Sequence, residues 1–136
     1  MKAKPTHPRL LADENTSRRL VSACRRRVRT FPIVHIATWH DGSWLGLDDA
    51  TLLMACGEAG LVLVAFDRAT LPWHAGQVLR AGKDHGGLVL FRRTVLTTNY
   101  GQQARLLTDF WFEKGQTWDC LNRVVYVPGW ASSHRS

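Results

Sequence analysis

The stretch "GLVLVAFD", residues 60–67, decides the fold because the six residues between its glycine and its aspartate are all apolar. A strand with one face in water alternates apolar and polar residues, whereas this run is apolar on both faces. Such runs are typical of strands in a parallel sheet that helices cover on both sides. "GLVLFR", residues 87–92, has the same character. The two runs therefore predict a parallel sheet with both faces buried.

Working outward from these runs, predicted strands and helices alternate along the chain. Further strands are predicted over three short apolar segments, residues 9–12, 33–38 and 123–128. Helices are predicted within four longer segments, residues 15–27, 47–60, 68–82 and 100–115. In the third of these, Pro72 predicts a turn ahead of a short helix. The alternation indicates the α/β class, with three layers and a central, mostly parallel sheet flanked by helices.

Length and composition limit the kind of protein this chain can be. With 136 residues, of which 45% are hydrophobic, we expect one domain with its core at about residues 9–128 and loose ends at 1–8 and 129–136. No apolar segment is long enough to cross a membrane, and the N-terminus lacks the apolar stretch of a secretory signal. The three cysteines are far apart, which favours reduced thiols in a cytoplasmic protein over disulfides or a zinc site.

The net charge of +7 and the sequence pI near 10 bear directly on function. A positive excess of this size attracts polyanions, of which nucleic acid is the commonest inside cells. The alternative is a solvated surface that binds nothing. Charge therefore favours a nucleic-acid partner without specifying one.

Acidic residues follow two of the predicted strands in this otherwise basic chain. Asp13 and Glu14 follow the first strand, Asp67 follows the strand at 61–66, and Asp48 and Asp49 open the second predicted helix. The carboxyl ends of parallel strands lie at one edge of the sheet, where α/β proteins bind their ligands. Carboxylates that meet there repel one another unless a cation joins them, and Mg²⁺ or Mn²⁺ prefers such oxygen ligands.

Each of these acids also has a structural interpretation. Asp13 or Asn15 can cap the first helix, and Asp67 can begin a turn. Asp48 or Asp49 can cap the second helix, where the helix dipole favours a negative charge. Which of these two adjacent aspartates is the cap and which is the ligand stays open.

Four segments resemble, in the same order, a PIN-like family that is described as a domain of unknown function and is related to VapC-type toxin ribonucleases. They are "LLADENTSRRL" at 10–20, "GLDDATLLMAC" at 46–56, "LVLVAFDRATLPWH" at 61–74 and "NRVVYVP" at 122–128. The resemblance covers about residues 9–128. It implies a PIN-like α/β fold, a metal-dependent ribonuclease pocket and a small antitoxin partner.

The resemblance also implies which residues form that pocket. The family's three acids fall on Asp13, Asp49 and Asp67, as ligands of Mg²⁺ or Mn²⁺ and as catalytic residues. Many relatives carry another acid where this chain has Ala69. The chain is instead similar to a branch in which a threonine and a histidine follow the third acid.

The function that we expect is a metal-dependent endoribonuclease, the toxin of a type II toxin–antitoxin pair, which hydrolyses RNA phosphodiester bonds. Other residues are expected behind the ligands or beside the substrate, namely Glu14, Asn15, Asp48, Arg68, Thr70 and His74. RNA-binding side chains are expected to include two arginines and three loop tryptophans, Arg18, Arg19, Trp39, Trp44 and Trp73. For the tryptophans, base stacking and ordinary packing are equally open.

Two other functions remain open. The missing carboxylate at Ala69 favours a catalytically inactive PIN-like module that binds RNA or a protein partner. The basic helix and the six tryptophans are also compatible with a structural subunit. Trp111 and Trp118 are expected to fill the core or a dimer contact. A homodimer is a further expectation, because exposed aromatic side chains need cover.

Overall fold

The computed structural model describes residues 8–129, and these form one sheet of five parallel strands in the order β2-β1-β3-β4-β5. The strands are β1 (Leu10–Ala12), β2 (Ile33–His35), β3 (Val62–Phe66), β4 (Leu88–Phe91) and β5 (Val124–Val127). Every paired neighbour runs parallel. The loose ends predicted at 1–8 and 129–136 lie almost entirely outside the described residues.

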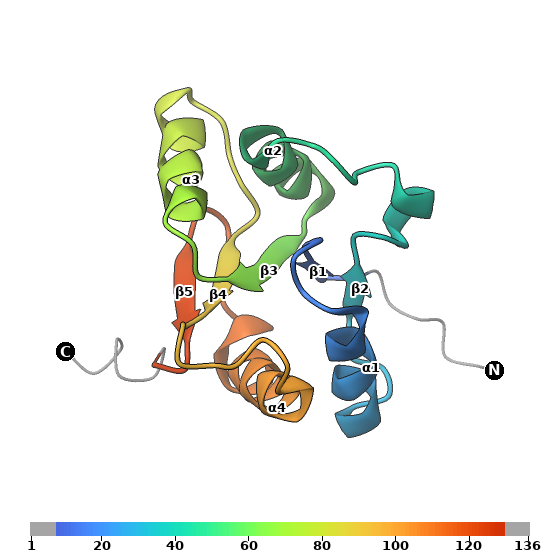
Figure 1. Cartoon of the computed structure of the whole chain (residues 1–136). Helices are drawn as coiled ribbons and strands as arrows, with labels where there is room; N and C mark the ends of the chain where they lie inside the picture. Colours follow the sequence, from blue (N-terminus) through green and yellow to red (C-terminus); the bar gives the residue numbers. More distant parts are fainter. Residues whose placement is uncertain (1–7, 130–136) are drawn as a thin grey trace.

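Helices cover both faces of this sheet, as Figure 1 shows. The α-helices are α1 (Arg18–Arg27), α2 (Asp49–Ala59), α3 (Thr70–Arg80) and α4 (Tyr100–Phe110). A short 3₁₀ turn, η1 (Trp39–Gly42), follows β2, and a π-helical turn, η2 (Trp111–Gly115), extends α4. Helices α1 and α4 pack together on one face, and α2 and α3 pack together on the other. The three-layer α/β class predicted from the sequence is confirmed.

The strands have apolar side chains on both faces because they separate two hydrophobic cores. In β3, Val62 and Val64 belong to the core under α1 and α4, whereas Leu63 and Ala65 belong to the core under α2 and α3. All four are at most 3% exposed. Fully burying a side chain such as Val or Leu stabilises a fold by roughly 1.5–3 kcal/mol. The two-sided burial predicted for residues 61–66 is confirmed.

The order of the strands creates a crevice between β1 and β3. From β1 the chain passes through α1 to β2 on one side, and α2 then returns it to β3 on the other side. At such a reversal the two connections leave in opposite directions, which opens a crevice at the carboxyl ends of the two central strands. Asp13 and Asp67 directly follow these two strands.

Side chains directly before α1 and α2 cap these helices, and the cap of α1 is Ser17, not Asp13 or Asn15. Ser17 caps α1 by accepting a hydrogen bond from the Arg19 amide at 3.0 Å. At the start of α2 it is Asp48 that caps, its Oδ1 accepting from the Thr51 amide at 2.7 Å. Asp49, in the first turn, is therefore free to face another partner.

Two predicted boundaries were wrong. Pro72 does not form a turn ahead of a short helix, because α3 already begins at Thr70. The amides of a helix's first turn have no intrahelical partner, so the missing N–H of proline costs nothing there. The strand predicted at 33–38 ends at His35, and the chain then bends into η1.

No helix within residues 8–129 is long and apolar enough to cross a bilayer.

Two helical glycines differ in the space around them, and we expect opposite effects from alanine. A Cβ on Gly57 in α2 would lie 2.5 Å from the Asp84 carbonyl oxygen, whereas a Cβ on Gly76 in α3 would have nothing within 4 Å. Gly57→Ala should therefore lower the free energy of unfolding by about 1–3 kcal/mol. Gly76→Ala should raise it by about 0.5–1 kcal/mol, because alanine loses less backbone entropy in a helix. Urea unfolding of both variants measures this, and equal effects would contradict the packing at Gly57.

Candidate functional site

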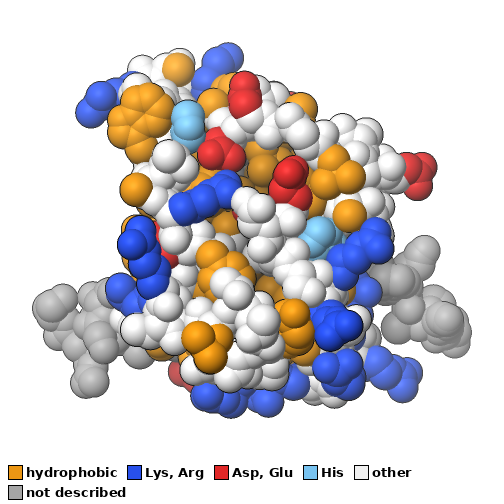
Figure 2. Space-filling view, viewed as in Figure 1, with side chains coloured by type: hydrophobic (Ala, Val, Ile, Leu, Met, Phe, Trp, Pro, Cys, Tyr) orange, Lys and Arg blue, Asp and Glu red, His pale blue; other side chains and the backbone are white. Residues whose placement is uncertain are grey.

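A pocket of about 200 Å³ lies at the crevice between β1 and β3. Its polar lining consists of side chains from three separate segments, Asp13, Glu14, Asn15, Asp49 and Arg68. Leu47 and Leu52 supply apolar walls. Figure 2 shows Asp and Glu side chains gathered on this face beside a basic side chain, while Lys and Arg side chains spread over α1. The acidic pocket therefore lies within a basic surface.

Asp13 is the buried carboxylate of this pocket and is only 2% exposed. Its backbone N–H donates to the Val64 carbonyl at 3.0 Å, which continues the β1–β3 ladder by one residue. Its Oδ1 accepts hydrogen bonds from the amides of Asn15 at 3.0 Å and Thr16 at 3.1 Å. These bonds fix the carboxylate so that Oδ2 is left for another partner.

Burial raises the pKa of Asp13 above its ordinary value of 3.8. The Arg68 guanidinium and the two backbone amides oppose this rise, and the nearby Asp49 carboxylate adds to it. Loss of water is the largest of these influences on the pKa. Asp13 is thus a carboxylate whose negative charge depends on a cation nearby.

Arg68 supplies that cation and joins two carboxylates. Its Nη2 lies 3.6 Å from Asp13 Oδ2 and 3.2 Å from Asp49 Oδ1. Its Nε is buried and has no hydrogen-bond partner among residues 8–129. One guanidinium therefore occupies the position between Asp13 and Asp49, with a donor left unused.

Asp49 reaches the pocket because Asp48 takes the capping role at the start of α2. Hydrogen bonds from Thr51 lower the pKa of Asp48, which is fully exposed. The other oxygen of Asp49, Oδ2, lies 4.0 Å from His74 Nε2 on α3. The open choice between the two aspartates is thereby resolved: Asp48 is the cap, and Asp49 faces the pocket.

Asp67 does not join this group, although it follows β3. Its Oδ2 lies 3.9 Å from Nε of Arg93, and Asp67 does not line the pocket. Within the described part of the chain, no three His, Cys, Asp or Glu side chains lie close enough together to hold a metal ion. The structure thus brings together two of the three predicted acids and pairs the third with an arginine.

The remaining residues predicted near the substrate surround the pocket at different distances. Glu14 Oε1 accepts a hydrogen bond from the Gly46 amide at 3.3 Å, which ties the loop after β1 to the loop before α2. Asn15 lines the pocket, while Thr70 is exposed at the first turn of α3. Glu14 and Asn15 are therefore part of the pocket wall.

The predicted RNA-binding tryptophans separate into two groups. Trp39 and Trp44 are partly buried against the core under α2 and α3, with ring centroids 5.9 Å apart. Trp73 on α3 is 60% exposed. Packing therefore accounts for Trp39 and Trp44, and Trp73 is available for stacking.

The two predicted arginines of α1 also differ. Arg19 lies over the Tyr100 ring at 5.9 Å, and Arg18 lines a second pocket beside β2. Of the tryptophans expected in the core or in a dimer contact, Trp111 is 2% exposed and Trp118 packs against the core of α1 and α4.

Sequence reasoning missed the arginines as counter-ions of specific carboxylates. Arg68 was expected beside the substrate, not between Asp13 and Asp49. Arg93 was not singled out, although the register that pairs Phe66 with Phe91 puts the residues after β3 beside those after β4. The "RR" that follows β4 was therefore a usable signal once the strand order was known.

Comparisons of the chain with protein-family models, curated proteins and solved structures found no match.

The raised pKa of Asp13 predicts a specific pH dependence of stability. The native state holds a proton on Asp13 at pH values where the unfolded chain has already released it, so stability falls as pH rises from about 3.8 through the raised pKa. Asparagine can accept the same two backbone hydrogen bonds without a charge. The free energy of unfolding of Asp13→Asn should therefore rise relative to that of wild type across this pH window, and the gain should persist at higher pH.

Urea unfolding at a series of pH values measures this difference. Asp109→Asn is a matched control, because this substitution also removes one negative charge, but from an exposed position on α4. Parallel curves for wild type and Asp13→Asn would contradict a burial-raised pKa at Asp13.

Proposed function

We propose that this chain is a metal-dependent endoribonuclease that hydrolyses RNA phosphodiester bonds at the Asp13 pocket. The observation that carries the proposal is the buried Asp13 carboxylate, which shares one cationic partner with Asp49 at the crevice between β1 and β3. Burying a charge is costly, and perturbed carboxylates in clefts are typical of functional sites. The net charge of +7 supports a polyanionic substrate.

The donor set of the pocket fits a small divalent cation. Asp13 Oδ2 and Asp49 Oδ1 both lie within 3.6 Å of a single Arg68 nitrogen, so both oxygens already converge on one position for a positive charge. Mg²⁺ is commonly held by one or two carboxylates, with waters and substrate phosphate completing its coordination. Asp13 and Asp49 would be those ligands. Asp67 would be a third only by leaving Arg93.

A bound Mg²⁺ or Mn²⁺ would supply an activated water and would stabilise the charge that develops on the phosphate. The chain's own residues would position the substrate. The amides of Asn15 and Thr16 hold the orientation of Asp13. Arg68, whose Nε is unpaired among the described residues, would exchange its carboxylates for the RNA phosphate through charge-assisted hydrogen bonds. His74, whose Nε2 lies 4.0 Å from Asp49, would contact the phosphate or transfer a proton.

The partners follow from the same proposal. The resemblance to PIN-like toxin relatives supports a cytoplasmic toxin with a small antitoxin as its partner. Exposed apolar side chains offer contact area for an antitoxin or a second copy of the chain, with Trp73 at 60%, Leu96 at 64% and Phe112 at 46% exposure.

A catalytically inactive PIN-like module is the second candidate, and a specific observation favours it. Arg68 compensates Asp13 and Asp49, and Arg93 compensates Asp67, so each of the three acids has a cationic partner without a metal. Such a module would use its basic surface to bind RNA and would leave it uncut.

Cleavage of a labelled single-stranded RNA in the presence of Mn²⁺ tests the first candidate. We expect wild type to cleave, and Asp13→Asn and Asp49→Asn each to lose at least about 100-fold, because a lost ligand removes several kcal/mol of charge stabilisation. Asp109→Asn, which removes an exposed carboxylate from α4, should cleave like wild type. Equal rates for all four proteins would trace the cleavage to a contaminating nuclease.

Calorimetric titration with Mn²⁺ separates the two candidates without relying on cleavage. Because Arg68 competes for the same oxygens, Arg68→Gln should tighten Mn²⁺ binding, by about tenfold if roughly 1.4 kcal/mol of competition is removed. Asp49→Asn should weaken binding in either background. Absence of Mn²⁺ binding to both wild type and Arg68→Gln would exclude the metal-dependent mechanism and leave the inactive module.

A further inference from the structure

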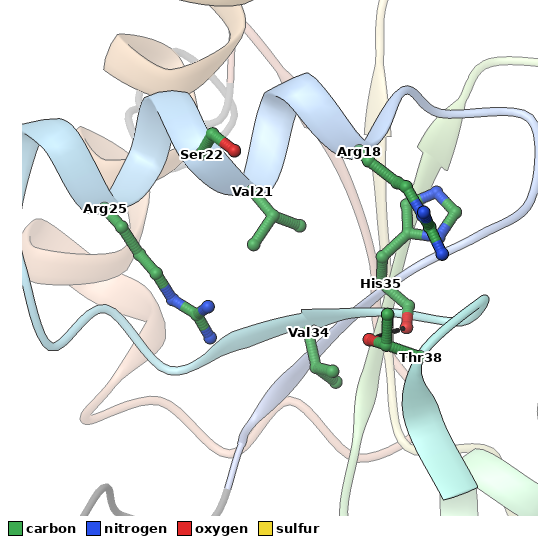
Figure 3. A pocket seen from close by; sticks show the side chains of 7 residues that line it. All are labelled: Arg18, Val21, Ser22, Arg25, Val34, His35 and Thr38. Carbon is green, nitrogen blue, oxygen red and sulfur yellow. Dashed lines mark hydrogen bonds between the residues drawn. The ribbon is translucent and has the colours of Figure 1, made fainter. Parts of the chain in front are cut away.

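A second pocket, of about 220 Å³, lies between α1 and the edge strand β2. Its α1 side includes Arg18, Ser22 and Arg25, and its β2 side includes Val34 and Thr38 (Figure 3). Residues at spacings of three, four and seven along a helix share one face. The stripe on α1 that starts at Arg18 therefore presents both arginines to the same hollow.

The charges at this pocket are all positive. Arg18 and Arg25 line it together with hydroxyl, imidazole and apolar groups, and none of its lining residues within 8–129 carries a carboxylate. Both arginine side chains extend from α1 towards β2, one at each end of the hollow, with Val21 and Val34 between them (Figure 3). Two guanidinium groups without a carboxylate favour an anionic ligand.

The two arginines differ in how firmly they are held. Arg25 Nη2 donates a hydrogen bond to the Ile33 carbonyl, which orients its guanidinium over the start of β2. Arg18 makes no hydrogen bond or ion pair with the other described residues. One guanidinium is thus preorganised, and the other has all its donors available to a ligand.

The hydroxyl groups of the pocket have distinct roles. Thr38 Oγ1 already donates to the His35 carbonyl at 3.0 Å, so its hydrogen is not available to a ligand (Figure 3). The Ser22 hydroxyl has no hydrogen-bond partner within residues 8–129, but it does not extend towards β2 as the arginines do (Figure 3). The Arg18 guanidinium therefore supplies the free donors of the hollow, and phosphate oxygens are the acceptors that suit it.

A single residue links this hollow to the acidic pocket. The Thr16 amide donates to Asp13 Oδ1 in the acidic pocket, and the Thr16 carbonyl accepts from Nε2 of His35, which lines the basic one. His35 is 7% exposed, so it forms part of the partition between the pockets. The loop from Asp13 to Ser17 therefore contacts both sites through Thr16.

We propose that the pocket between α1 and β2 binds a backbone phosphate of single-stranded RNA, next to the phosphodiester in the acidic pocket. The choice of RNA as the ligand rests on the proposed function, while the preference for phosphate rests on Arg18 and Arg25 alone. In this proposal the basic pocket binds the RNA backbone, and the acidic pocket contacts the phosphodiester bond that is cleaved.

The test is RNA binding measured by fluorescence anisotropy in EDTA, where metal-dependent cleavage cannot occur. The probe is a labelled single-stranded 12-nucleotide RNA, titrated with wild type, Arg18→Gln and Arg26→Gln over a series of salt concentrations. Arg26→Gln is the matched control, because it removes the same charge from the same helix. Arg26 is exposed like Arg18 but does not line the pocket. Arg18 is exposed and unpaired within the described residues, so its replacement should not disturb the fold.

We expect Arg18→Gln to weaken binding by about tenfold and to reduce the slope of log K against log salt by about 0.7, the value for one lost phosphate contact on a single strand. Arg26→Gln should weaken binding less than about twofold. Equal losses in the two variants, or no RNA binding by wild type, would overturn the proposal. Poly-glutamate is a second probe. If wild type binds it as tightly as the RNA, and Arg18→Gln weakens both equally, the proposal is overturned in favour of an acidic protein partner.

Two further measurements keep this proposal distinct from the proposed function. Inorganic phosphate should compete with the RNA for wild type and compete less for Arg18→Gln, and phosphate inhibition that is unchanged in Arg18→Gln would overturn the site. RNA binding that depends on Arg18 in a protein that never cleaves with Mn²⁺ would support the pocket and refute the nuclease. Mn²⁺-dependent cleavage by a protein whose RNA binding is unchanged in Arg18→Gln would support the nuclease and refute the pocket.

Discussion

The parallel pairing of β1 between β2 and β3 is the constraint on which the rest of the structure depends. All three residues of β1 are 0% exposed, and each pairs with a residue of both neighbours. So short a strand holds its place only because both edges and both faces are covered. The pairing continues through the Asp13 amide to Val64, and it thereby carries a carboxylate into the interior at the crevice where the sheet order reverses.

A buried carboxylate at that point makes the electrostatics of the site follow from the fold. A buried negative charge is costly without a partner, so a cation from a neighbouring element stabilises the charged form of Asp13. Arg68, just after β3, is that cation and reaches Asp49 as well. If the chain is a nuclease, Asp13 and Asp49 would hold its metal in place of Arg68, and Arg68 would contact the substrate.

Two sites of opposite charge then lie on either side of one loop. The loop from Asp13 to Ser17 turns its amides towards the Asp13 carboxylate, and its Thr16 carbonyl meets His35 at the end of β2. The same loop leads directly into α1, whose arginines line the hollow beside β2. On the proposed function, the basic hollow would bind the polyanion and the acidic pocket would act on it.

The sequence by itself determined the α/β class, the two-sided sheet and the strand ends that carry acids, because these depend on local periodicity and on burial. Which acids share a pocket was decided only by the tertiary structure. Asp48 and Asp49 are adjacent in sequence, yet one caps α2 and the other meets Arg68, since helix geometry points them in different directions. Likewise, Asp67 pairs with Arg93 because β3 and β4 are neighbours in register. The spacing of residues in the sequence does not indicate which strands become neighbours.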